Sequence, residues 1–408
     1  MVAGGMVLRG EEVQRAGSGS TLPSMPQHGS GGSKDRVGES AVVTQDPRFR
    51  GGALAQISAF VAASNSIGHT TRLYYGLRPP LRGTSPLDDV AATTTATRFG
   101  RVDALGVPIN ARRLAARLDT ARSIWVVATI GFYGLPALRS GRPYACWIGT
   151  TLRSEQRGRW PGLDPLRRTS ELVNRRPLLH WEREVLRGAS LVLAPTWPIA
   201  EELASTAGLD PARIGLLPIP IDTQRFAPLT DGDWISRPPR LVFVGRADDP
   251  RKNAPLLLTA FARARESMPE LTLRLVGRPP GGRLPDGVES VGEVRDVAEH
   301  VRDARLLVLP STQEGFGIVA AEALACGVPV VTTPCGGPAE TITRSGAGVV
   351  LSGFDPTELA ERTLALIQDE ATLVSMRQAG RAYVLDSLGV ERFHTTLATA
   401  MDTLDRAA

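Results

Sequence analysis

The chain has 408 residues, of which 42% are hydrophobic and 22% are charged, and this composition excludes a largely disordered protein and favours two globular domains. Its uninterrupted apolar runs are shorter than the 18 residues expected of a membrane-spanning helix, and we expect no secretory signal. Three cysteines without metal-site spacing fit a reducing cytoplasm.

Positive charge is concentrated in the first half of the chain. The formal net charge is +5, but residues 61–190 contain 20 arginines against nine acidic residues. Nucleic-acid binding would call for interleaved aromatic residues and a recognisable module, and neither is present. The arginines therefore indicate contact with anionic membrane lipid or a phosphorylated acceptor, unless they are simply solvated.

The first element that suggests a ligand follows a tail. Residues 1–38 are rich in Gly, Ser, Gln and Pro and are predicted to be disordered. A short strand at 41–43, the pair Gly51 and Gly52, and a helix over 53–65 then form a pattern that cradles phosphate, because glycines let backbone amides approach an anion. A plain tight turn explains the two glycines as well.

The rest of the first half reads as alternating strands and helices. His69 begins one strand and His180 lies in an amphipathic helix, so both are interpreted as structural. Gly149 and Thr150 follow a strand, at the sheet edge where doubly wound sheets bind ligands. The predicted strands are 69–75, 124–128, 144–148 and 189–194, the helices 111–122 and 178–186, and the loop, a mobile cover or membrane contact, 157–168.

The second half is more regular and predicts a parallel sheet covered by helices. Its helices begin near Asn253, Asp296 and Gly317. The predicted strands are 240–245, 272–277, 288–291, 305–309 and 328–332, and the closing helices are 356–369, 373–385 and 389–404.

Two glutamates mark the strongest motif. Glu314 lies in the loop after a buried strand, and Glu322 lies in the helix that begins at Gly317. The amides of Gly315, Phe316 and Gly317 open that helix, whose N-terminus suits a phosphate. The segment is therefore expected to hold a sugar, a diphosphate and a ribose in a row.

This segment, with Leu-Pro-Ser before it and Gly-Val-Pro-Val-Val after the helix, resembles the paired-glutamate motif of the retaining glycosyltransferases of family 4. The resemblance implies an α/β fold of the GT-B type, with two Rossmann-like, doubly wound domains facing across a cleft. The implied divisions are an acceptor domain at 39–225, a donor domain at 226–388 and a final helix at 389–408 that crosses back to the first domain.

The resemblance also implies roles for individual residues. In the family the first Glu, here Glu314, touches the donor sugar, and the second, here Glu322, binds the ribose hydroxyls. The stretch that matches Val294 meets the base, and the first glycine loop, here Gly51 and Gly52, faces the donor phosphates and the acceptor. Many members have a histidine where this chain has Gly149 and Thr150, a departure that concerns the acceptor and the donor sugar.

A loop after the strand at 240–245 supplies positive charge. Arg246 and Lys252 stand in Gly-Arg-Ala-Asp-Asp-Pro-Arg-Lys-Asn, which resembles the diphosphate-binding loop of phosphatidylinositol mannosyltransferase-like enzymes. Lys252 is the only lysine outside the tail, in a chain with 45 arginines. A compact ammonium is therefore expected to be needed there, where a planar guanidinium would not fit. The alternative is a solvated loop with incidental charge.

Together these features predict an enzyme that moves a hexose-type sugar from a nucleotide diphosphate sugar to an acceptor hydroxyl. Cationic side chains are expected to stabilise the leaving diphosphate, so neither a metal nor a cofactor is expected. The alternatives are a noncatalytic nucleotide-sugar-binding scaffold and a sugar-nucleotide epimerase. The expected location is the cytoplasm, with peripheral contact at the inner face of the membrane.

Overall fold

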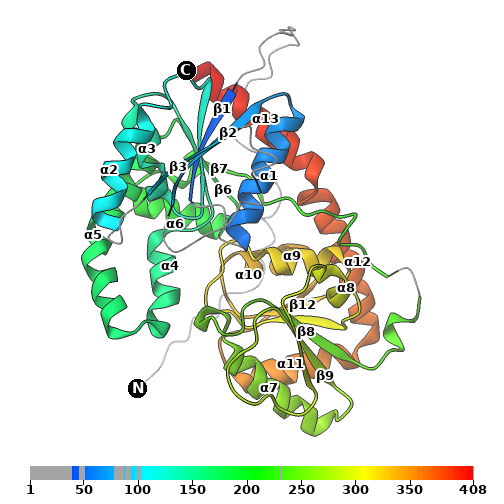
Figure 1. The fold of residues 1–408 in the computed structure, drawn as a ribbon. Helices are drawn as coiled ribbons and strands as arrows, with labels where there is room; N and C mark the ends of the chain where they lie inside the picture. The colour runs from blue at the N-terminus through cyan, green and yellow to red at the C-terminus, as the bar shows by residue number, and fades with distance from the viewer. Residues whose placement is uncertain are drawn as a thin grey trace, which may run out of the picture. The chain divides into compact units, whose positions relative to one another are not determined.

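The computed structural model describes residues 39–45, 51–77, 87, 93–98, 103–229 and 232–407, which all lie in one unit, Val37–Ala408. The tail predicted for 1–38 lies outside the described residues. Within them, helices and strands alternate along most of the chain (Figure 1). The predicted α/β class is confirmed.

The first sheet has seven parallel strands in the order β3-β2-β1-β4-β5-β6-β7. In β1, Ala41, Val42 and Val43 are all buried, because helices cover both faces of the sheet. The strands are β1 Glu39–Thr44, β2 Thr70–Leu77, β3 Thr93–Arg98, β4 Ser123–Ala128, β5 Ala145–Ile148, β6 Leu191–Ala194 and β7 Ile214–Leu216.

The second sheet has six parallel strands in the order β10-β9-β8-β11-β12-β13. The apolar run that precedes the glutamate motif is β11, at the middle of this sheet. The strands are β8 Arg240–Val244, β9 Thr272–Val276, β10 Val288–Gly292, β11 Leu306–Leu309, β12 Val330–Thr332 and β13 Gly348–Val350.

Both sheets are doubly wound, as predicted. In each, the chain starts at a central strand, moves outward in one direction, and then returns to build the other side. The strand order therefore reverses between β1 and β4 and again between β8 and β11. Parallel sheets bind ligands at the carboxyl ends of the strands beside such a reversal. The loops that follow β8 and β11 are those with Arg246, Lys252 and Glu314.

Thirteen α-helices occur in the described residues, together with short 3-10 turns. The helices are α1 Gly52–Ser66, α2 Asp103–Ala115, α3 Leu135–Ser140, α4 Leu152–Arg159, α5 Pro165–Gly188, α6 Trp197–Ala207, α7 Ala254–Ser267, α8 Val297–Arg302, α9 Ile318–Ala325, α10 Gly337–Ser345, α11 Pro356–Gln368, α12 Glu370–Ser387 and α13 Val390–Ala407. The 3-10 turns are η1 Gly131–Gly134, η2 Trp160–Gly162, η3 Pro211–Arg213, η4 Gly232–Ile235 and η5 Pro250–Lys252.

Three apolar clusters form the core. One lies between the first sheet and α2, α3, α5 and α6, and another lies between the second sheet and α7 and α11. The third joins residues of α1, α9 and α13 with the opposite faces of both sheets. The last helix reaches the first sheet, where the ring of Phe393 lies 5.3 Å from that of Trp147.

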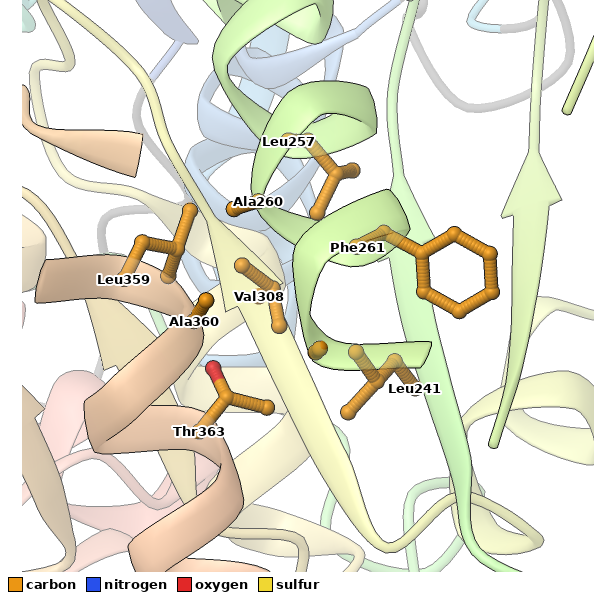
Figure 2. A pocket seen from close by; sticks show the side chains of 9 residues that line it. Leu241, Leu257, Ala260, Phe261, Val308, Leu359, Ala360 and Thr363 are labelled. Carbon is orange, nitrogen blue, oxygen red and sulfur yellow. The ribbon is translucent and has the colours of Figure 1, made fainter. Parts of the chain in front are cut away.

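The packing under α7 and α11 leaves only a small gap. Figure 2 shows it lined by the side chains of Leu241, Leu257, Val308 and Leu359, with the hydroxyl of Thr363 at one side. Its volume is about 10 Å³, roughly one water molecule. This gap is part of the core and not a ligand site.

Several predicted elements are corrected by the structure. The loop predicted at 157–168 is largely helical, because it contains the end of α4, η2 and the start of α5. The helix predicted at 111–122 ends at Ala115 and begins earlier, at Asp103.

Candidate functional site

The loops after β8 and β11 meet through an ion pair. Lys252 Nζ lies 2.5 Å from Glu314 Oε1, and both side chains are mostly buried. Ser311 Oγ lies 2.7 Å from the same carboxylate oxygen. The lysine therefore has a fixed position, and its ammonium is held at the carboxyl edge of the second sheet.

Close backbone packing shapes the glutamate loop. Gly317 has a φ of +74°, and a Cβ at this position would lie 2.3 Å from Pro338. Gly337 N donates a hydrogen bond to the carbonyl oxygen of Gly315. Only glycine combines this backbone conformation with this close approach, so α10 holds the start of α9 in place.

Glu322 lies in α9, just over one turn after its first residue, Ile318. Burial raises the pKa of Glu322 to about 7, with Arg225 lowering it in part. Among the described residues its carboxylate accepts no hydrogen bond, so its oxygens are available to an external donor. A partly exposed carboxylate of this kind is suited to hydroxyl groups, which would supply the missing hydrogen bonds.

Gly51 and Gly52 lie beside the glutamate helix. Gly51 has a φ of +110° with open space around it, and Gly52 begins α1. A Cβ on Gly52 would lie 3.7 Å from Ile318 Cδ1, in the first turn of α9. The structure thus brings the first glycine loop next to the helix that carries Glu322.

Arg246 and Val294 are farther from this centre. Arg246 is 55% exposed, and its guanidinium lies 2.7 Å from Asp249 in the same loop. Val294 follows β10 at the same sheet edge and packs against the core cluster that includes α9. Neither has a direct contact with Lys252 or Glu314 in the described part of the chain.

Gly149 and Thr150 contact the glutamate loop directly. A Cβ on Gly315 would lie 2.6 Å from the carbonyl oxygen of Gly149, and Gln313 Nε2 lies 3.5 Å from Thr150 Oγ1. A Cβ on Gly149 would lie 2.9 Å from Gln56 Oε1. A larger residue at Gly149, where many members of the resembled family have histidine, would therefore have to displace the end of the Gln56 side chain.

Arg251 and Glu155 form an ion pair beside Lys252 that was not predicted from the sequence. Arg251 donates to Glu155 on α4 at 2.9 Å and to Asp249 at 2.7 Å, and these partners raise its pKa although burial opposes the shift. The side chain of Arg251 also fills the space that a Cβ on Gly158 would occupy. No local pattern could reveal a pair of residues separated by 96 positions.

A second missed residue is Glu182 on α5. Its side chain is fully buried and accepts hydrogen bonds from the amides of Gly131 and Leu152, at 3.3 and 3.0 Å. Burial raises its pKa to about 7, and those two amides lower it in part. A signal was present in the sequence, since Glu182 occupies an apolar helical position in register with Leu178 and Val185.

Glu182 and Glu202 together fix the loop that follows β5. Ser154 Oγ donates to Glu202, and Thr151 Oγ1 lies 3.1 Å from the same carboxylate. Because Glu182 binds the amide of Leu152, carboxylates from α5 and α6 both hold the start of α4. The loop with Gly149 and Thr150 immediately precedes this anchored segment.

Two absences hold for the ranges that the structure describes. No group of three or more His, Cys, Asp or Glu side chains there could hold a metal ion. No helix among those residues is long and apolar enough to cross a membrane.

Comparisons with known proteins agree on one class of enzyme. Residues 238–369 match the family described as glycosyl transferases group 1. The D-inositol 3-phosphate glycosyltransferase of Thermomonospora curvata is 32% identical over 264 residues, which cover 56% of this chain and 61% of the relative. The D-inositol 3-phosphate glycosyltransferase of Geodermatophilus obscurus is 34% identical over 216 residues, which cover 46% of this chain and 47% of the relative. The chain thus spans about half to three-fifths of the length of these relatives.

Solved structures share the fold at low sequence identity. Sucrose-phosphate synthase from Thermosynechococcus elongatus superposes with a TM-score of 0.69 at 18% identity, over 91% of this chain and all of that one. HepE of Anabaena in complex with UDP superposes with a TM-score of 0.69 at 17% identity, over 90% of this chain and all of that one. WaaG, a glycosyltransferase involved in lipopolysaccharide biosynthesis, superposes with a TM-score of 0.65 at 18% identity, over 88% of this chain and 98% of that one. The GT-B fold predicted from the sequence is confirmed.

Proposed function

We propose that this chain, whose residues 238–369 match the group 1 glycosyl transferases, is a retaining enzyme that moves a hexose-type sugar from a nucleotide diphosphate sugar to an acceptor hydroxyl. The observation that carries the proposal is the Lys252 and Glu314 pair, fixed beside the point where the strand order of the second sheet reverses. Ligands of doubly wound sheets bind outside the carboxyl ends of the strands at such a reversal, so the Lys252 ammonium would contact a ligand bound there.

The donor occupies the second half of the chain. Lys252 and Arg246 bind its diphosphate, together with the amides of Gly315, Phe316 and Gly317 at the start of α9. Glu314 orients the sugar, and the unpartnered carboxylate of Glu322 accepts hydrogen bonds from the ribose hydroxyls. Solved structures of similar fold that carry UDP or UDP-glucose support a nucleotide sugar as the donor.

Two outer contacts complete the donor site. Gly51 and Gly52 face the diphosphate from the start of α1, which packs against α9. Val294 meets the base from the loop after β10. The base is then contacted largely by backbone and apolar groups. The nucleotide panel described below tests which base is bound.

Charge development explains the reaction. As the bond between the anomeric carbon and the diphosphate breaks, the sugar becomes cationic and the diphosphate gains negative charge. Lys252, Arg246 and the amides of α9 stabilise that charge, so a metal ion is not required for this step. The acceptor attacks the same face of the sugar, its hydroxyl proton passes to the departing phosphate, and the anomeric configuration is retained. No protein nucleophile takes part.

The acceptor binds at the carboxyl edge of the first sheet, near Gly149 and Thr150. The acceptor is a lipid, a glycan or a small molecule, and one of its hydroxyl groups receives the sugar. The curated relatives are named for D-inositol 3-phosphate. The enzyme works in the cytoplasm and contacts the inner face of the membrane peripherally. The arginine excess of residues 61–190 supports that location.

One observation favours a second candidate, a noncatalytic nucleotide-sugar-binding scaffold. Gly149 stands where many members of the resembled family have histidine, and Gln56 Oε1 lies 2.9 Å from the position that a Cβ would take there. A scaffold would keep the donor site and lose turnover. Binding and turnover therefore have to be measured separately.

The test is a thermal-shift panel with UDP, GDP, ADP and dTDP, followed by an assay of diphosphate release from the matching nucleotide sugars. A ligand at 100 times its dissociation constant adds about 2.7 kcal/mol to the unfolding free energy. We expect one nucleotide to shift the melting temperature, and Glu322→Ala to abolish that shift. Glu361→Ala, an exposed site on α11, is the matched control and should keep it.

The possible outcomes separate the candidates. A shift with turnover supports the enzyme, and a shift without turnover for any acceptor class favours the scaffold. No shift with any of the four nucleotides contradicts both.

A further inference from the structure

The start of α5 projects into solvent. Residues 164–170 are all exposed, and between Gly158 and Asn174 no described side chain is buried. A helix that serves only the core would bury one face along this length. The first turns of α5 therefore present a surface that the rest of the described chain does not cover.

Apolar side chains are concentrated on this surface. Leu166 is 82% exposed and Val173 is 65% exposed, and their spacing of seven places them on one side of the helix. Leu172 and Trp160 are also exposed, so four of the eight exposed large hydrophobic residues in the described chain fall within 14 positions. Such grouping on the otherwise polar first turns of α5 indicates an interaction surface.

Arginines surround the apolar residues. The segment 153–176 contains seven arginines and three acidic residues, for a net charge of +4. The acidic residues already have partners: Glu155 pairs with Arg251, Asp164 with Arg167, and Glu171 accepts from Gln156. Arg157, Arg175 and Arg176 have no ion pair within the described residues. Arginines without an ion pair thus lie beside the exposed apolar residues of this segment.

We propose that the segment from α4 to the middle of α5 is a docking surface for the anionic face of a lipid bilayer, with Leu166 and Val173 entering the headgroup region and arginines binding lipid phosphates. An apolar strip flanked by arginine is the composition that binds bilayer interfaces, because the long arginine stems let the charge reach the headgroups. Nucleic acid is disfavoured, since the single aromatic residue here, Trp160, lies under Arg168.

The base of this segment contacts the loop with Lys252. Glu155 pairs with Arg251, and a Cβ on Gly162 would lie 2.5 Å from Pro250. A bilayer on the docking surface would therefore lie close to the donor loop, and the acceptor would be a lipid-linked hydroxyl. That choice of acceptor rests on the proposed function, whereas membrane binding itself does not.

The test is flotation of the full chain with phosphatidylcholine vesicles, with and without about 30% phosphatidylglycerol, at about 50 mM salt. We expect flotation only with the anionic vesicles. The double variants Leu166→Ser/Val173→Ser and Arg175→Gln/Arg176→Gln should each bind at least fivefold less. The control is Val374→Ser/Leu385→Ser on α12, where two exposed apolar residues eleven positions apart also share a helix face.

Three results would overturn the proposal. They are the absence of wild-type flotation, undiminished flotation of both test variants, and a melting temperature lowered by Leu166→Ser/Val173→Ser, which would mean that the chain itself covers this surface. A fourth contradicting result would come from light scattering. If the wild type is a dimer and Leu166→Ser/Val173→Ser is a monomer, a second copy of the chain covers this surface in place of a bilayer. The nucleotide shift is measured on the same variants, so failure of the donor site is recognised separately from failure to bind membrane.

Discussion

Lys252 and Glu314, 62 positions apart in the chain, form a 2.5 Å ion pair that joins the loops after β8 and β11. The pair balances its own charge, so the ammonium can sit partly buried without a ligand. A diphosphate bound there would compete with Glu314 for the lysine. Turnover should therefore depend on this lysine more than on the exposed Arg246.

We predict that Lys252→Ala lowers kcat at least a hundredfold, because removing one donor to a developing anion costs about 3 to 4 kcal/mol. Lys252→Arg should rescue little of this loss. The ammonium is a compact point charge 2.5 Å from Glu314 Oε1, and a planar guanidinium would not place its charge at the same point. Steady-state kinetics with Arg362→Ala on α11 as control would check this. Turnover of Lys252→Ala within threefold of wild type would exclude the assigned role.

Gly315→Ala should damage the site through backbone displacement. The new methyl group would lie 2.6 Å from the carbonyl oxygen of Gly149, a separation that real Cβ atoms do not tolerate. We expect at least a tenfold loss of turnover and a smaller nucleotide-induced thermal shift. Gly353→Ala, with open space around the added atom, is the matched control. Equal effects of the two variants would argue against the contact between the two loops.

Glu182 should make stability depend on pH. Its folded pKa of about 7 exceeds the ordinary value of 4.5, so the folded protein holds this proton more tightly than the unfolded chain. The stabilisation is fully present below about pH 4.5 and is lost as the pH rises through 7, by an amount on the order of 3 kcal/mol.

Urea unfolding at pH 5 and pH 8 measures this loss. Because glutamine does not titrate, we expect Glu182→Gln to reduce the difference in unfolding free energy between the two pH values, while its amide oxygen still accepts the hydrogen bonds from Gly131 and Leu152. Glu182→Ala should destabilise the protein at both values by leaving those buried amides unpaired. Glu361→Gln serves as the control. A pH dependence identical in wild type and Glu182→Gln would refute the assignment.

Arg251 and Glu155 should be energetically coupled. Both side chains are more than 80% buried and lie 2.9 Å apart, so solvent screens them less than a surface pair. A double-mutant cycle with Arg251→Ala and Glu155→Ala should give a coupling of about 1 kcal/mol in the unfolding free energy. Arg159, which is half exposed and 3.8 Å from the same Glu155, supplies the comparison pair and should couple more weakly.

Local pattern was enough to predict most of the fold. Branched apolar runs such as those of β4 and β11 identify buried parallel strands, and glycine and proline mark their ends. The strand β3 was missed because its sequence, Thr-Thr-Thr-Ala-Thr-Arg, lacks an apolar run. The start of α5 was mistaken for a loop, although Asp164 caps it by accepting from the amide of Arg167 and Pro165 occupies its first turn.

The candidate site was less accessible to sequence reasoning. Residue type and position after a strand suggested Lys252, Glu314 and Glu322 separately. Their spatial relations depend on strand order and on glycine contacts that bring distant loops together, which no periodicity encodes. The roles of Arg246 and Val294 remain predictions, since neither makes a contact that distinguishes it.

The scarcity of lysine gives this protein a built-in chemical reporter. Only Lys34 and Lys252 carry ε-amines, so outside the chain's first residues a mild amine-reactive reagent has a single target, at the centre of the candidate site. Its rate of modification, followed by peptide mass spectrometry, would respond to any ligand that covers the loop after β8. Screening nucleotides or acceptors for protection of Lys252 therefore needs neither a mutation nor an activity assay.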